Sequence, residues 1–210
     1  MIPIQKRNNY ALMAEAARRR FLTYDQSAVI AKSPVTYDEQ AIYLPVLDRT
    51  CRISRATGEL AWSSPTGFLP TAEFHDALTI FDYLCDAKPN RCLSGQLKSM
   101  ASFGHAFHTN LLEAETASPL ESAIDREPDS FRSACQALGG VPFPNCDIGF
   151  TLPFFPDLPV TLQFWHSDDE FPPRLRYLWD CNATDCIRYE TMYYALGLLE
   201  SRLKFWMDQD

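Results

Sequence analysis

The sequence from Ala41 to Ser63 reads AIYLPVLDRTCRISRATGELAWS. It contains three short stretches, 41–47, 50–54 and 59–63, which are rich in β-branched and aromatic residues, as β-strands are. Only a few residues separate them, among them the turn residues Ala56-Thr57-Gly58. Antiparallel strands can be joined by such short turns, whereas parallel strands need a crossover. The segment therefore predicts a small antiparallel meander.

Helices are predicted before and after this meander in the sequence. Strands and helices do not alternate regularly along the chain. One helix is expected from about Lys6 to Leu22, and another begins at Thr71 as its N-cap and has an apolar stripe from Phe74 to Cys85. A strand is expected from Pro159 to Trp165, and a long amphipathic helix from Thr184 to about Met207. We therefore expect one α+β domain over residues 1–210, with a twisted, mainly antiparallel sheet and helices packed chiefly on one side.

The segments between these elements give weaker patterns. Residues 28–31 are expected to be extended, 102–115 and 130–138 to be helical, and Gly139-Gly140 to end the second of these helices. The proline-rich segment 141–159 is interpreted as a loop that packs against the body and holds a strand near 146–152. The Arg18-Arg19-Arg20 run is expected to form a solvated last turn of the first helix.

Charge and composition exclude several classes of protein. The 27 acidic side chains exceed the 19 basic ones, which gives a formal charge of −8 and argues against a nucleic-acid partner, because such binding needs Lys and Arg. No apolar run reaches the roughly 18 residues of a membrane span, and the first residues do not resemble a signal peptide. We therefore expect a cytoplasmic protein with no membrane partner and with reduced thiols.

The cysteines do not favour a metal cluster. They number seven and never form Cys-x-x-Cys; the closest pairs, Cys181 with Cys186 and Cys85 with Cys92, offer two thiolates where an iron-sulfur cluster needs four. We therefore do not expect an iron-sulfur cluster in this chain. The sequence also has no glycine-rich phosphate loop, no dinucleotide fingerprint and no nucleophile elbow.

Two histidine-containing groups are candidate sites. His105 and His108 are spaced i, i+3 on a predicted helix, so both imidazoles can reach one metal ion or one flat ligand. Alternatively, one of them caps a carbonyl and the other is solvated. We expect these two histidines to share a pocket with His166 and at least one of the three to contact a ligand.

The second group is Trp165-His166-Ser167-Asp168-Asp169-Glu170-Phe171-Pro172-Pro173, at the end of a predicted strand. Hard oxygen ligands here suit a divalent cation, and adjacent carboxylates can shift one another's pKa for acid-base chemistry. Asp168, Asp169 and Glu170 are thus candidate metal ligands. The alternative, which we favour, is that these acids anchor the following turn or pair with Arg174 and Arg176.

The same group carries a family resemblance. Together with Leu178-Trp179-Asp180, Leu93-Ser94-Gly95 and Glu190 in an aromatic-rich terminal helix, the segment Phe164 to Pro173 resembles the family catalogued as domain of unknown function 3786. The similarity extends over most of the chain, and Asp169-Glu170-Phe171-Pro172 is its most specific part. Some members resemble accessory proteins of anaerobic one-carbon and corrinoid metabolism that carry a cysteine-rich iron-sulfur module, which this chain lacks.

The resemblance implies an intracellular protein of an anaerobe with a ligand-binding or accessory role, and it identifies no catalytic residue. We expect a binding module in which His105, His108, Trp165 and His166 line a pocket for a corrinoid or haem-type tetrapyrrole. A metal- or acid-base-dependent enzyme that uses the His166, Asp168, Asp169 and Glu170 cluster is the alternative, and a protein-protein interaction domain is a second one. The aromatic residues of the terminal helix are compatible with a homodimer, with a monomer as the alternative, and the resemblance implies a protein partner in one-carbon metabolism.

Overall fold

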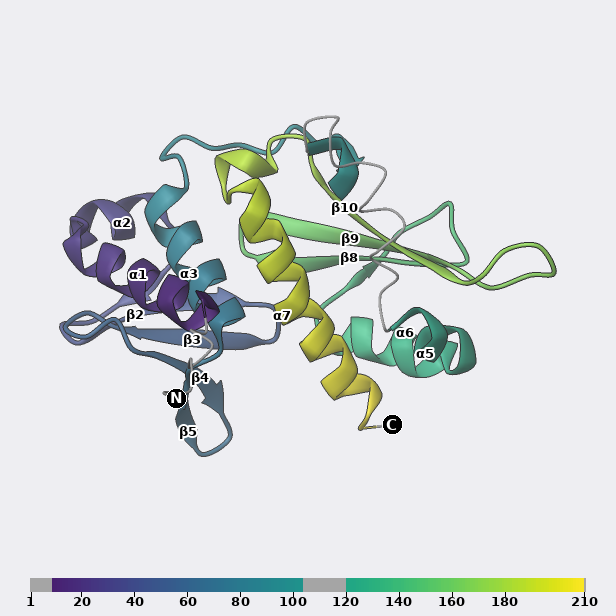
Figure 1. The fold of residues 1–210 in the computed structure, drawn as a ribbon, viewed down its shortest axis with the longest axis horizontal. Coiled ribbons are helices and arrows are strands. Elements are labelled where there is room, and N and C mark those ends of the chain that lie inside the picture. Colours follow the sequence, from purple (N-terminus) through teal and green to yellow (C-terminus); the bar gives the residue numbers. More distant parts are fainter. Residues whose placement is uncertain (1–8, 104–119, 210) are drawn as a thin grey trace, which may run out of the picture.

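The computed structural model describes residues 9–103 and 120–209, which form two antiparallel five-stranded sheets with helices packed around them (Figure 1). The first sheet is a meander in which each strand pairs with the next. Cys51 lies opposite Leu44 on one side and opposite Trp62 on the other. The predicted meander is confirmed, with additional strands at both edges: β1 (Thr36–Tyr37), β2 (Ala41–Val46), β3 (Arg49–Ser54), β4 (Leu60–Ser64) and β5 (Gly67–Thr71).

The second sheet has the strand order β6-β10-β9-β8-β7, so an early segment of the chain forms one edge of a later meander. A buried carboxylate holds that segment in place: Asp180 at the end of β10 accepts hydrogen bonds from the backbone N–H of Ser94 (2.9 Å) and of Gly95 (2.8 Å). The strands are β6 (Leu97–Ser99), β7 (Val141–Pro142), β8 (Ile148–Phe155), β9 (Leu158–Trp165) and β10 (Arg174–Asp180).

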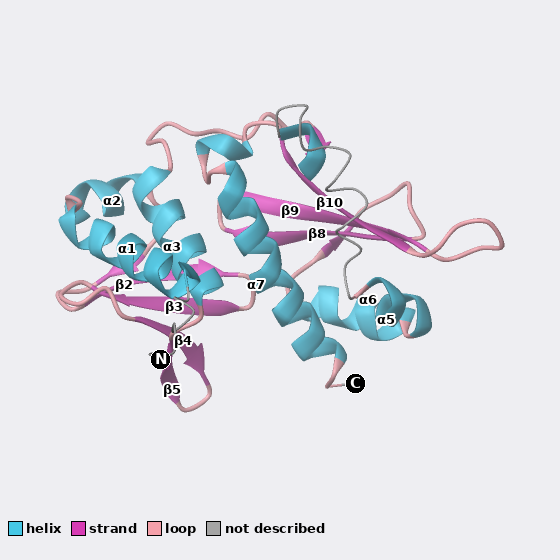
Figure 2. Ribbon diagram, viewed as in Figure 1, coloured by secondary structure: helices cyan, strands magenta, loops and turns pink. Residues whose placement is uncertain are grey.

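The helices complete an α+β fold, as the sequence predicts. Figure 2 shows α1, α2 and α3 on one side of the first sheet, while α7 runs through the middle of the molecule. None of the helices in the described ranges is both long and apolar enough to cross a membrane. The bounds are α1 (Asn9–Thr23), α2 (Gln26–Lys32), α3 (Phe74–Asp86), α5 (Glu121–Arg126), α6 (Pro128–Ala137) and α7 (Tyr189–Met207), with 3₁₀ turns at Met100–Phe103 and Ala183–Asp185.

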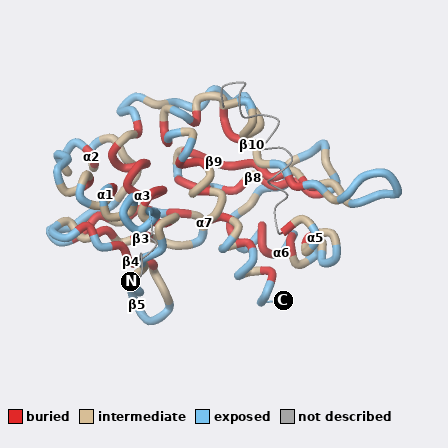
Figure 3. The backbone as a smooth tube through the Cα atoms, in the orientation of Figure 1, coloured by how far each residue is buried: buried red, intermediate tan, exposed pale blue. Residues whose placement is uncertain are grey.

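One apolar core runs beneath both sheets, and buried residues dominate α3 and the central strands of the second sheet (Figure 3). The two sheets meet where the backbone N–H of Leu47 donates to the carbonyl of Phe154 (3.0 Å). Close by, the ring of Tyr83 stacks on Phe155 with centroids 3.9 Å apart. This contact joins α3 to the hairpin of β8 and β9.

The last helix contacts both halves of the core. Thr191 donates to Asp82 of α3 (2.5 Å), and Trp206 donates to Asp48 in the turn between β2 and β3 (3.0 Å). On the other side, Tyr177 of β10 donates to Glu200 (2.7 Å). Helix α7 therefore holds the first sheet, α3 and the second sheet against one another.

Residues 28–31 are helical, so the extended conformation predicted for them is wrong. They lie in α2, whose N-cap Asp25 accepts a hydrogen bond from the backbone N–H of Ser27 (2.9 Å). The cap outweighs the strand preference of the β-branched pair Val29-Ile30. Similarly, Thr71 ends β5 and is not the N-cap of α3, which is Glu73.

The strand expected near 146–152 is confirmed as β8, which continues to Phe155, beyond the expected end. Pro153 is tolerated because a bulge between Leu152 and Phe155 interrupts the pairing with β9. The helix predicted at 130–138 is confirmed as α6, and Gly139 after it has a φ of 76°, as a left-handed helix end requires.

The arginine run at the end of α1 is not uniformly solvated. Arg20 forms ion pairs with Asp82 (2.5 Å) and Asp86 (3.1 Å) of α3, and its side chain is 27% exposed. The remaining helix prediction, 102–115, lies almost entirely outside the described residues; residues 102 and 103 belong to a 3₁₀ turn.

Candidate functional site

His166 lies just beyond the last residue of β9, where the chain leaves the second sheet. Its backbone N–H donates to Oδ2 of Asp147 (2.8 Å), which fixes the chain as it enters the exposed turn. Its ring meets the buried ring of Phe164 edge-on, with centroids 5.2 Å apart. Asp147 therefore fixes the backbone of His166, and the sheet supports one side of its imidazole through Phe164.

Helix α5 supplies the residue that orients this imidazole. Oδ1 of Asp125 lies 2.8 Å from Nδ1 of His166. The same carboxylate accepts hydrogen bonds from the Ser167 hydroxyl at Oδ2 (2.6 Å) and from the Ser167 backbone N–H at Oδ1 (3.2 Å). The Ser167 hydroxyl contributes most to a lowered pKa of Asp125, and the hydrogen bond with His166 contributes next, so this carboxylate is stabilised in its ionised form.

This arrangement gives the two ring nitrogens of His166 different roles. Nδ1 faces the carboxylate of Asp125, so Nε2 is the nitrogen left for a ligand, as in metal-ligating and acid-base histidines. The side chain of His166 is 38% exposed, and Nε2 makes no hydrogen bond to the described residues. Ser167 donates to Asp125 and not to His166, so these three residues do not form a serine nucleophile with its base.

The acidic residues that follow His166 behave differently from one another. Oδ1 of Asp168 accepts hydrogen bonds from the backbone N–H groups of Glu170 (2.8 Å) and Phe171 (2.7 Å), so Asp168 anchors the turn, as the favoured interpretation predicts. The side chains of Asp169 and Glu170 are exposed. Arg176 does not pair with these acids and lies over the ring of Trp165, 5.3 Å from its centroid.

The predicted metal ligands Asp168, Asp169 and Glu170 are not arranged as a metal-binding group. Within residues 9–103 and 120–209, no group of three or more His, Cys, Asp or Glu side chains is arranged to hold a metal ion. The carboxylate that the His166 imidazole contacts is that of Asp125, which is not among the predicted site residues. Nothing local marks Asp125, because the contact joins two segments that are distant in sequence.

The other predicted site residues have mixed outcomes. Trp165 is half-buried and directly precedes His166 in the sequence, and the ring that the His166 imidazole contacts is that of Phe164. His105 and His108 lie outside the described residues, and their approach to His166 stays a prediction. All seven cysteines are free thiols.

Comparison with known protein families gives a match. A family model described as "Domain of unknown function (DUF3786)" matches residues 25–201, which include both sheets, α5 and the His166 turn. No curated protein and no solved structure matches the chain. A function must therefore be argued from the geometry of the chain itself.

Proposed function

We propose that this chain, which belongs to the family of domain of unknown function 3786, is a ligand- or cofactor-binding accessory protein in which Nε2 of His166 contacts the bound group. One observation supports the proposal above all others. The imidazole is oriented through Nδ1 by the ionised carboxylate of Asp125, while Nε2 is partly exposed. Such a carboxylate partner raises the basicity of a ligating histidine and fixes its direction.

The chemical classes that suit this imidazole are a haem-type iron, a corrinoid cobalt and a divalent transition metal. Trp165 supports a flat ligand less directly, because the guanidinium of Arg176 already lies over its ring. The proposal includes a role in anaerobic corrinoid and one-carbon metabolism, which the family resemblance implies. It also includes a cytoplasmic location, with which the free thiols agree.

Titration of the anaerobically purified protein with haem, cobalamin, Co²⁺ and Zn²⁺ tests the proposal, with calorimetry for all four and visible spectra for the coloured ones. We expect one of them to bind, His166→Ala to abolish the binding, and Asp125→Asn to weaken it by about 10- to 100-fold, as the loss of an orienting carboxylate does. His75→Ala is the matched control, because His75 lies on α3, and Figure 1 shows α3 and α5 on opposite sides of α7. Wild type that binds none of the four, or His166→Ala that binds as tightly as wild type, overturns the proposal.

An enzyme is a second candidate, because an imidazole oriented by a carboxylate is also what a general base needs. In this version Asp125 replaces the Asp168, Asp169 and Glu170 cluster as the partner of His166, since the Asp168 carboxylate is engaged by its own turn. If no cofactor binds and both variants fold normally, the interaction-domain alternative takes precedence.

Helix α7 is the element through which we propose self-association. Phe205 is 45% exposed, whereas its neighbour Trp206 is directed to Asp48 of the same chain. Sedimentation of the purified protein at micromolar concentration tests this: a homodimer is expected, and a single 24 kDa species excludes it.

A further inference from the structure

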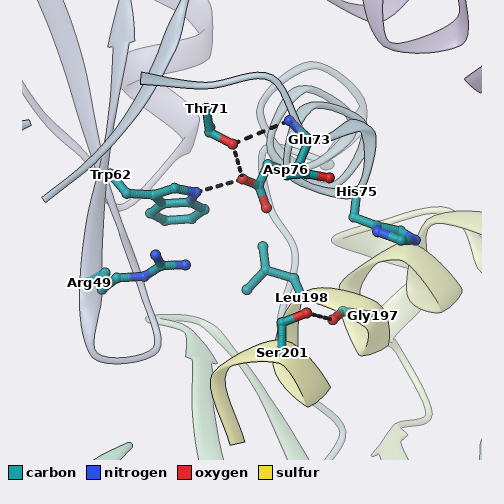
Figure 4. Close-up of a pocket in the computed structure, with 9 residues that line it drawn as sticks. All are labelled: Arg49, Trp62, Thr71, Glu73, His75, Asp76, Gly197, Leu198 and Ser201. Carbon is teal, nitrogen blue, oxygen red and sulfur yellow. Dashed lines mark hydrogen bonds between the residues drawn. The ribbon is translucent and has the colours of Figure 1, made fainter. Parts of the chain in front are cut away.

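A second site, separate from His166, lies between the helix-facing side of the first sheet and helices α3 and α7. It is a hollow of about 270 Å³ with Arg49 and Trp62 on the sheet side, Asp76 and His75 from α3, and Leu198 and Ser201 from α7 (Figure 4). Sites for drug-sized ligands have volumes from roughly 300 Å³ upward. This hollow therefore suits a molecule of a few heavy atoms and is too small for a tetrapyrrole.

Arg49 is the unusual residue of this hollow. It begins β3 and shares the core-facing side of the strand with Cys51 and Ile53, both fully buried, because side chains alternate along a strand. Its guanidinium lies over the ring of Trp62, 4.2 Å from the centroid. Figure 4 shows it directed into the space beneath Trp62.

The charge of Arg49 has no direct counter-ion. Burial, followed by the nearby Arg202, lowers the pKa of Arg49, and the attraction of Asp48 and Asp76 offsets only part of this shift. The closest acid in sequence, Asp48, is paired with Arg202. Among the described residues, Arg49 makes no salt bridge and no side-chain hydrogen bond, so its donors are available to a ligand. A guanidinium in this position is suited to a bidentate bond with a carboxylate.

Asp76 supplies the opposite charge to the same hollow. It is 8% exposed, and its Oδ2 accepts hydrogen bonds from the indole N–H of Trp62 (2.6 Å) and from the hydroxyl of Thr71 (2.7 Å). In Figure 4 the other oxygen points into the space above Leu198. Oδ2 of Asp76 therefore links Trp62 and Thr71 in the wall of the hollow, and Oδ1 can accept a hydrogen bond from a ligand.

From these two groups we infer that the hollow binds a small zwitterion of amino-acid size. Arg49 pairs with the carboxylate of the ligand, Oδ1 of Asp76 accepts from its ammonium group, and Leu198 packs against its carbon atoms. A simple anion would be repelled by Asp76 and a simple cation by Arg49, whereas a molecule with both charges satisfies both residues.

Isothermal calorimetry with glycine, L-alanine and L-glutamate, compared with acetate and methylammonium alone, tests this inference. We expect at least one amino acid to bind at least about tenfold more tightly than either half-molecule. Arg49→Met should lower that affinity by at least about tenfold, the loss expected for a charge-assisted pair, and Arg49→Lys should restore part of it.

The matched control is Arg52→Met, on the same strand but on the opposite face, which should bind as wild type does. Thermal melts of each variant separate lost binding from lost folding. The inference is overturned if no amino acid binds, if acetate binds as tightly as the amino acids, or if a folded Arg49→Met variant binds like wild type. His166→Ala should leave amino-acid binding unchanged, so this result does not depend on the proposed cofactor function.

Discussion

The guanidinium of Arg91 forms an ion pair with the carboxylate of Asp157, with Nη2 2.5 Å from Oδ2. The Arg91 side chain is 4% exposed and that of Asp157 is 34% exposed. The hydroxyl of Tyr83 joins them, because it donates to Asp157 and accepts from Arg91 (3.1 Å). A polar network thus connects the loop after α3 with the turn between β8 and β9.

Replacement of Asp157 by alanine should lower the free energy of unfolding by about 2–3 kcal/mol. The change removes the counter-ion of a buried guanidinium and the acceptor of a buried phenol, although the partial exposure of Asp157 keeps the loss below that of a fully buried pair. Urea denaturation measures it. Lys88→Ala removes a more exposed ion pair with Asp185 and should lower the free energy of unfolding by less than about 1 kcal/mol. Equal losses in the two variants would show that the burial of Arg91 does not increase the cost.

The turn after β9 should depend on Asp168 and not on Glu170. Asp168→Ala removes the acceptor of two backbone N–H groups and should cost on the order of 1 kcal/mol, the usual value for a capping side chain. Glu170→Gln, at an exposed side chain, should change stability by less than about 0.5 kcal/mol. Thermal denaturation of the two variants at neutral pH distinguishes them, and the reverse order would show that Glu170 is the anchor.

Asp125 should titrate below the ordinary range of an aspartate, because Ser167 and His166 hydrogen-bond to its ionised form. A carboxyl whose pKa is lower in the folded state adds stability above its unfolded pKa of about 3.9, and loses that contribution as the pH falls through the folded pKa. Carbon-detected NMR of the carboxyl group should show a higher pKa in Ser167→Ala than in wild type. The stability difference between the two proteins should shrink as the pH falls below about 4. An unchanged pKa in the variant would be inconsistent with the hydrogen bond.

The seven thiols should react with iodoacetamide in an order set by their surroundings. Cys92 is exposed and should react first. Burial raises the pKa of Cys85 to about 11 and of Cys186 to about 12, and raises the pKa of Cys51 and Cys135 further. Because the thiolate is the nucleophile, these four should stay unmodified in the native protein. Mass spectrometry of the labelled peptides reads the order; early modification of Cys135 would mean that α6 opens readily.

The fold follows from the sequence where local pattern and packing agree. The meander is predictable because short turns separate its strands, and α6 because Gly139 supplies the left-handed end. Helix α2 is mispredicted because the β-branched pair Val29-Ile30 competes with a capping aspartate, and the burial of Val29 together with the cap decides the outcome. Strand β8 is harder to predict, because its sequence contains a proline that usually argues against a strand and that its bulge accommodates.

The site is less predictable than the fold. His166 is visible in the sequence as a rare residue at the end of a strong strand, but its partner Asp125 comes from a helix far away in sequence, and no local pattern marks it. Arg49 is different, because it occupies a position of β3 where the alternation calls for an apolar residue. A charged residue at such a position is the kind of local inconsistency that accompanies function.

Helix α7 is shared by the two halves of the core, since it bonds to the turn of the first sheet through Trp206 and to the second sheet through Glu200. Neither sheet can therefore release this helix without uncovering apolar surface on the other. Thermal unfolding should accordingly be cooperative, with one calorimetric transition whose measured and van't Hoff enthalpies agree. Two separated transitions would mean that the halves melt independently. Because both sheets pack against α7, the stability of each sheet depends on the other. A substitution beneath α7 in one half of the core should therefore also lower the temperature at which the other half unfolds.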